Sequence, residues 1–105
     1  MDRTSWHGLT LPRQMGNIGS EIARARHWEG QGDDARRDAA IERALELIDL
    51  TRCDPRRRTG LREICRLREV VCDWYLRCGA YAVSPAALQE YCTSFMLFAA
   101  SAGRP

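Results

Sequence analysis

Apolar side chains recur at intervals of three and four residues along four separate stretches of the chain, the spacing that places them on one face of an α-helix. The clearest stretch covers about residues 60–77, where Thr59 can cap the first turn and Gly79 ends the helix. The predicted buried face of this helix consists of Leu61, Ile64, Cys65, Arg68, Val71, Cys72, Tyr75 and Cys78.

Three other helices are predicted by the same periodicity and by the residues at their ends. The first covers about residues 16–29, and glycines end it. The second covers about residues 34–52 and ends ahead of an Asp-Pro pair. The last begins after Ser84, a favourable N-cap, with Pro85 in the first turn, where the missing N–H has no helical partner to lose.

Residues 1–15 are predicted to form an extended N-terminal arm. Apolar and polar residues alternate between Trp6 and Leu11, and Pro12 disfavours helix in the residue before it. The remaining residues, 16–105, then form one unit of four helices. Because connections of a few residues favour antiparallel neighbours, the predicted fold is all-α, an antiparallel up-down four-helix bundle.

The composition is that of an ordinary globular chain. It has 105 residues, of which 45% are hydrophobic and 29% are charged, and this size and balance indicate one folded domain. No apolar run is long enough to cross a membrane, and the first residues lack the apolar segment of a secretory signal. We therefore expect a cytoplasmic protein without membrane contact.

The chain contains no recognisable catalytic or metal-binding signature. It has no glycine-rich phosphate loop, no nucleophile elbow and no H-E-x-x-H motif. Its five cysteines include no C-x-x-C pair of the kind that zinc sites use, and their odd number does not suit a disulfide scaffold. We expect a protein that is not an enzyme, with free thiols, no bound metal and no cofactor.

Arginine is distributed unevenly and suggests a binding surface. All 16 basic residues are arginine, and they are densest after the second predicted helix. A step of four residues places Arg58, Arg62 and Arg66 along one side of a helix, about 6 Å apart along its axis, similar to the spacing of phosphates on a strand. The predicted nucleic-acid-binding residues are Arg56, Arg57, Arg58, Arg62 and Arg66. The alternative is a solvated face whose charge is balanced by carboxylates of the second helix.

Large aromatic residues indicate self-association. Trp6, Trp28 and Trp74 are difficult to bury in so small a bundle, and large aromatics that a core cannot cover are typical interface anchors. We therefore predict a homo-oligomer with these three tryptophans at its interfaces. The N-terminal arm could instead cover the same surface within one chain.

Three segments carry a resemblance to a known group. Over about residues 16–98 the chain resembles a group of small microbial helical-bundle proteins. The segments that carry the resemblance are GNIGSEIARARHW, IERALELIDLTRCDP and LREICRLREVVCDWY. That group is similar in size and helix plan to the accessory variability proteins of diversity-generating retroelements and to ribosomal-RNA intervening-sequence proteins. The resemblance implies a homo-oligomeric ring of bundles that binds RNA and a reverse transcriptase without catalysing a reaction. It assigns no individual site residue.

Together these patterns predict a non-catalytic, oligomeric accessory protein. It would bind nucleic acid, with RNA favoured over DNA, through its arginine-rich surface, and a reverse transcriptase would be a further partner. The alternative is a structural protein–protein interaction module in which the arginines pair with an acidic protein surface and have no nucleic-acid role.

Overall fold

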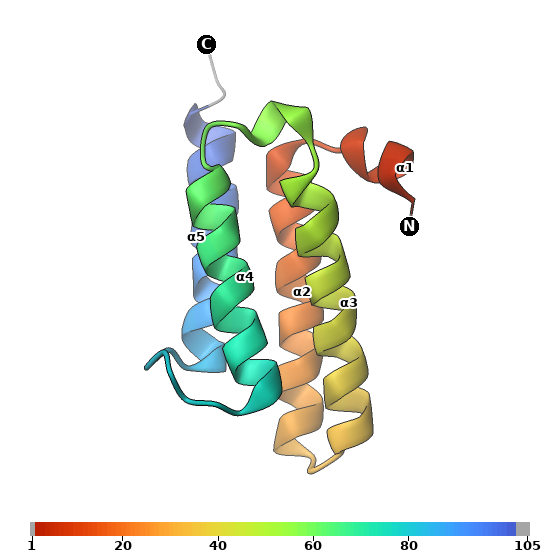
Figure 1. The fold of residues 1–105 in the computed structure, drawn as a ribbon, viewed down its shortest axis with the longest axis vertical. Coiled ribbons are helices and arrows are strands. Elements are labelled where there is room, and N and C mark those ends of the chain that lie inside the picture. Colours follow the sequence, from red (N-terminus) through yellow and green to blue (C-terminus); the bar gives the residue numbers. More distant parts are fainter. Residues whose placement is uncertain (1, 103–105) are drawn as a thin grey trace.

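Within residues 2–102, four long helices, one short helix and a 3₁₀ turn make up the fold (Figure 1). The computed structural model describes the backbone of residues 2–102 and the side chains of residues 2–94. Among the described residues there is no strand, which confirms the all-α class. The elements are α1 (Arg3–His7), α2 (Leu11–Gly30), α3 (Asp34–Arg52), the 3₁₀ turn η1 (Pro55–Arg57), α4 (Leu61–Leu76) and α5 (Pro85–Ala102).

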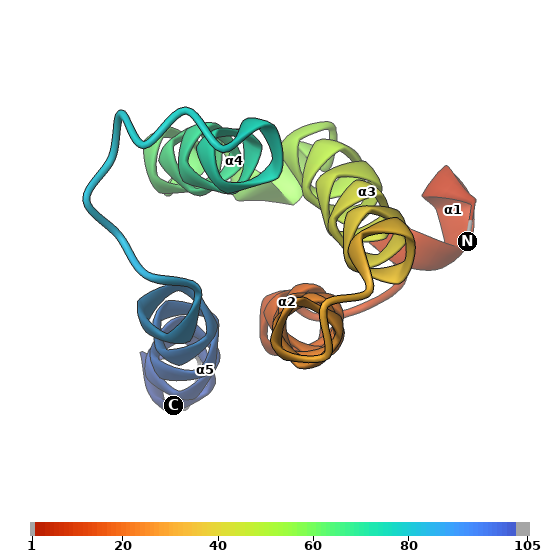
Figure 2. The same ribbon diagram turned by 90° about the horizontal axis from the view of Figure 1, so that it is seen from below.

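The helices lie in two layers, α3 beside α4 and α2 beside α5 (Figure 2). The α2 helix packs extensively on both α3 and α5, and α4 packs on α3. By contrast, α4 and α5 touch at only a few positions, although residues 77–84 connect them directly. The side of the molecule between α4 and α5 is therefore the least closely packed.

The N-terminal segment is helical, so the predicted extended arm is wrong. Asp2 caps α1 by accepting a hydrogen bond from the Ser5 N–H at 2.7 Å. Thr10 caps α2, which begins at Leu11 and not near residue 16. Pro12 lies in the first turn of α2, a position that proline favours, so it marks the start of a helix and not an obstacle to one.

Other helix ends agree more closely with their local signals. The Asp33 side chain caps α3, and Ser84 caps α5 by accepting a hydrogen bond from the Ala87 N–H at 3.1 Å. Thr59 does not cap α4: the residue before that helix is Gly60, with φ of 89°, and no side chain caps this end. Gly60 supplies a left-handed turn that most residues disfavour.

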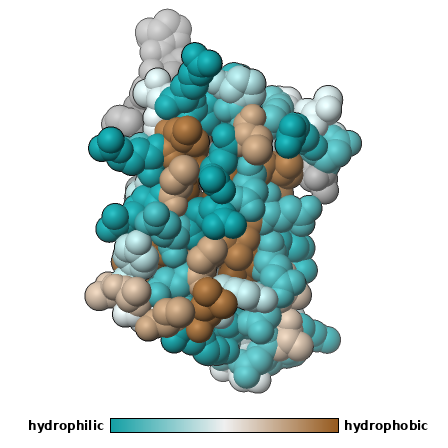
Figure 3. Space-filling model, viewed as in Figure 1, coloured by the Kyte–Doolittle hydropathy of each residue, from teal (hydrophilic) through white to brown (hydrophobic). Residues whose placement is uncertain are grey.

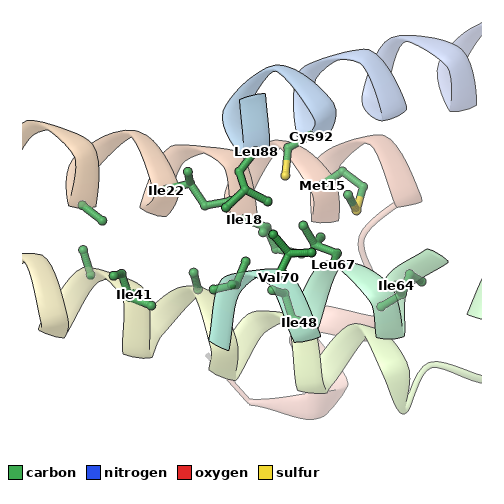
Figure 4. Close-up of a cluster of buried hydrophobic side chains, with 14 of the residues drawn as sticks. Met15, Ile18, Ile22, Ile41, Ile48, Ile64, Leu67, Val70, Leu88 and Cys92 are labelled. Carbon is green, nitrogen blue, oxygen red and sulfur yellow. The ribbon is translucent and has the colours of Figure 1, made fainter. Parts of the chain in front are cut away.

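The core lies between the two layers (Figure 4). Ile18 and Ile22 of α2, Ile41 and Ile48 of α3, and Leu88 of α5 belong to it. On α4 the buried residues are Ile64, Leu67, Val70 and Val71, so the predicted buried face was wrong in part: Leu61 and Cys78 are exposed.

Trp6 is fully buried and belongs to this core. Its indole N–H donates a hydrogen bond of 2.8 Å to the Thr51 hydroxyl on α3, which in turn donates to the Leu47 carbonyl at 2.8 Å. The α1 helix thus covers the indole ring within one chain. This burial removes the reason for expecting Trp6 at an interface between chains.

Candidate nucleic-acid interface and an adjoining groove

Arg56 stabilises the connection between α3 and α4. Its guanidinium donates to the Asp54 carboxylate through Nη2 at 2.6 Å and Nε at 3.0 Å, and to the Leu9 carbonyl at 2.7 Å. Asp54 is buried and also accepts a hydrogen bond of 3.0 Å from Gln14 of α2. Hydrogen bonds from Arg56, followed by one from Gln14, hold the pKa of Asp54 well below its usual range.

Arg57 points into the same network. Its Nε donates to the Gln14 side chain at 2.9 Å, and its Nη2 lies 3.7 Å from Asp54. The side chain is only 11% exposed, and burial lowers the pKa of Arg57. Arg56 and Arg57 therefore stabilise this connection within the chain, and a phosphate contact by either residue stays a prediction.

The other three predicted residues lie on the surface. Arg58, Arg62 and Arg66, which we call the arginine row, are exposed. Among the described residues, Arg58 and Arg62 have no hydrogen-bond or ion-pair partner, and the Arg66 guanidinium lies over the Tyr81 ring at 5.0 Å. Arg58 precedes the first turn of α4, so only two members of the row lie on the helix itself.

Most other arginines are neutralised by carboxylates. The described ion pairs include Arg68 with Asp49 at 2.7 Å, which matches the predicted balance by carboxylates of the second helix for that residue. Carboxylates also pair with Arg24, Arg36, Arg37, Arg43, Arg52 and Arg77. Among the described residues, the arginine row has no carboxylate partner. Arg3, Arg13 and Arg26 lack one as well, but they are spread over α1 and α2 and form no such row.

An apolar groove runs beside the arginine row, between α4 and α5. Its volume is about 460 Å³. We call it the α4–α5 groove; its lining residues are Arg62, Glu63, Arg66, Leu67, Val70, Val83, Ala87, Leu88 and Tyr91. In the view of Figure 3, hydrophobic residues reach the surface at several places, over α4 and also over α3.

Trp28 and Trp74 are half-buried and make contacts within the chain. The Arg36 guanidinium lies over the Trp28 ring at 4.6 Å. The Trp74 indole donates to Glu29 at 2.9 Å, and the buried Arg37 donates to the same carboxylate at 2.7 Å. Partial burial opposes ionisation of Glu29, but the two hydrogen bonds outweigh it and lower the pKa of Glu29. An interface at either tryptophan stays a prediction.

The cysteines are free thiols in different environments. Cys53 and Cys78 are exposed, whereas Cys92 is buried between α5 and α2, and burial raises the pKa of Cys92 to about 12. Among the residues that the structure describes, no three histidine, cysteine or carboxylate side chains lie close enough to hold a metal ion. Within the same part of the chain, none of the helices combines the length and apolar character needed to span a bilayer.

Comparison with known proteins gives no further constraint, since no family model, curated protein or solved structure matches the chain. The resemblance to retroelement accessory proteins and intervening-sequence proteins therefore stays a prediction.

Proposed function

We propose that this chain is a non-catalytic, homo-oligomeric helical protein that binds the backbone of nucleic acid through Arg58, Arg62 and Arg66. The observation that supports it is an exposed row of arginines without carboxylate partners, on a protein whose other arginines are mostly ion-paired. A guanidinium offers planar, paired donors that suit a phosphate group, and contacts of this kind give affinity with little sequence preference.

Further parts of the proposal come from the sequence. RNA is favoured over DNA, and a reverse transcriptase is a further partner, on the strength of the resemblance stated above. The proposal takes the four long helices as an antiparallel up-down bundle. It places the protein in the cytoplasm, where a reducing environment would keep the five cysteines as thiols.

The test compares two triple variants that remove the same charge. In one, the arginine row is changed to glutamine, R58Q/R62Q/R66Q. In the control, R3Q/R13Q/R36Q, three exposed arginines outside the row are changed. Affinity for a fluorescent single-stranded RNA is measured by anisotropy between about 50 and 200 mM salt, where counterion release gives a linear dependence of log K on log salt concentration.

We expect the row variant to flatten the salt slope by roughly two to three units, because each lost phosphate contact removes about 0.7 to 0.9 of a unit. The control should keep most of the slope. An equal decrease of the salt slope in both variants would show that RNA binding depends on the net charge of the protein and not on the arginine row. No measurable binding by the unaltered protein at the lowest salt would end the nucleic-acid proposal.

A protein–protein interaction module without a nucleic-acid role is the second candidate, and the α4–α5 groove favours it. Apolar grooves between helices commonly receive an amphipathic helix. On this alternative the unaltered protein binds RNA no better than the row variant at any salt concentration.

A further inference from the structure

The α4–α5 groove marks a side of the molecule that one chain leaves open. Each of the two helices packs on its other neighbour, α4 on α3 and α5 on α2, but they scarcely contact one another. Leu67, Val70 and Leu88 are nearly buried and form the apolar part of the lining. The groove is thus a continuation of the core to the surface.

The apolar surface extends beyond the groove. The large hydrophobic residues that are exposed among the described side chains are Leu61 (38%), Leu76 (65%), Val83 (42%) and Tyr91 (39%). All four belong to α4, to α5 or to the segment between them. Val83 and Tyr91 line the groove itself, and Leu61 and Leu76 lie at the two ends of α4. Exposed apolar residues around an apolar groove on a small protein mark a contact with another macromolecule.

The sequence of α5 also indicates a contact with another macromolecule. Residues 95–100 read FMLFAA, with no polar residue, and they continue α5 towards its C-terminal end. An entirely apolar run in a helix is typical of a helix that packs on more than one neighbour. Among the described residues, α2 is the helix that packs extensively on α5.

The charges along the groove suit a second copy of the chain. Arg62 and Arg66 line it together with Glu63, and all three side chains are exposed. When identical faces meet about a two-fold axis, the arginines of each copy can approach the glutamate of the other.

The face is also of a suitable size. Helices of 16 and 18 residues are roughly 25 Å long and about 10 Å across each, so side by side they present roughly 500 Å² in projection. The accessible area of a grooved face exceeds its projection. A standard interface takes about 800 Å² of accessible surface from each partner, which a face of these dimensions can supply.

We infer that two copies of the chain pack together through their α4–α5 grooves and the apolar residues around them. The inference rests on the oligomeric state within the proposed function and does not depend on nucleic-acid binding. In the pair, the apolar groove of each copy is covered by α4 and α5 of the other, and Arg62 and Arg66 lie at the edge of the contact.

Two neighbouring alanines provide a matched test. Ala87 lines the groove, whereas Ala86 is equally exposed but lies outside it. The variants Ala87→Glu and Ala86→Glu each add one carboxylate to the first turn of α5, where a negative charge suits the helix dipole and keeps the fold intact. Val83→Glu, outside α5, places a charge in the groove independently.

Mass is measured by light scattering after size exclusion at micromolar concentration, with helicity checked by circular dichroism. We expect the unaltered chain and Ala86→Glu to have twice the chain mass of 12.0 kDa, and Ala87→Glu and Val83→Glu to have the mass of one chain. The inference is overturned if the mass of the unaltered protein differs from that of two chains. It is also overturned if both groove variants keep the mass of two chains. Either result leaves the salt-slope test of the arginine row intact, so failure of the pairing inference can be distinguished from failure of the nucleic-acid proposal.

Discussion

Three consecutive arginines, Arg56, Arg57 and Arg58, differ in role because only the first two reach Asp54. The carboxylate lies below the surface between α2 and the end of α3, with Gln14 completing its hydrogen bonds. Burial of a carboxylate is costly unless several donors compensate it, and here they do. The chain direction after η1 then carries Arg58 away from this network to the surface.

Replacing Asp54 with asparagine should lower the free energy of unfolding by about 2 kcal/mol, because the guanidiniums of Arg56 and Arg57 lose their counter-charge while Arg57 stays largely buried. The melting temperature should fall by roughly 10 °C. Asp34→Asn is the control, since Asp34 is 75% exposed and pairs only with Arg77 among the described contacts. Equal thermal melts for the two variants would contradict the assigned role of Asp54.

The same residue gives a pH dependence with a definite sign. Because the pKa of Asp54 is lowered in the folded protein from its ordinary value of 3.8, its stabilisation is fully present above that value and is lost as the pH falls further. Urea unfolding between pH 2 and 6 should therefore show a steeper acid loss in the unaltered chain than in Asp54→Asn. Parallel curves would mean that Asp54 is not the titrating group.

At the scale of helices, α5 is attached through one extensive contact among the described residues. It packs mainly on α2, where the backbones approach closely at Gly19: a Cβ placed there would lie 3.2 Å from the Cβ of Cys92. Among the described side chains, the hydrogen bond between Arg26 and Gln89 is the one polar link from α2 to α5. Cys92 is therefore a natural reporter of α5 leaving α2.

Gly19→Leu should open this contact. In a chain whose other cysteines are serine, the Cys92 thiol has a pKa raised to about 12 and should react slowly with a disulfide reagent at pH 8, because it must be exposed first. We expect Gly19→Leu to accelerate the reaction at least roughly tenfold while most helicity remains. Gly30→Leu is the control, since a Cβ there meets nothing within 4 Å. Unchanged reactivity in Gly19→Leu would show that α5 docks elsewhere.

The sequence predicted helices well where the end signal is local. Asp33 and Ser84 each cap a helix through a residue three positions later, so a short window contains the evidence. Thr10 gives the same kind of signal, but Pro12, which is expected to disfavour helix in the residue before it, lies in the first turn of α2. The burial of Trp6 and Arg57 depends on Thr51 and Gln14, which are distant in sequence, and no periodicity contains that information.

On the scale of the whole molecule, buried polar networks join α2, α3 and α4 at two places and leave α5 out. At one end Asp54 joins η1 to α2, and at the other the buried Arg37 of α3 binds Glu29 of α2 and the Trp74 carbonyl of α4. The first network ties α2 to the connection between α3 and α4, and the second ties α2, α3 and the end of α4 together. Neither reaches α5, so the α4–α5 side is the one that a partner can complete.

Pairing through the α4–α5 groove would join two arginine rows in one assembly, since Arg62 and Arg66 line the groove. A strand held by two rows gains avidity, because the second contact forms at high effective concentration.

Ala87→Glu, which retains every arginine, should therefore weaken RNA binding at least roughly tenfold and reduce the salt slope by about half. Ala86→Glu should behave like the unaltered chain in the same anisotropy titrations. A single-chain Ala87→Glu variant with undiminished affinity would show that each chain binds independently. The arginine row would then act without the pair, and the groove would serve assembly alone.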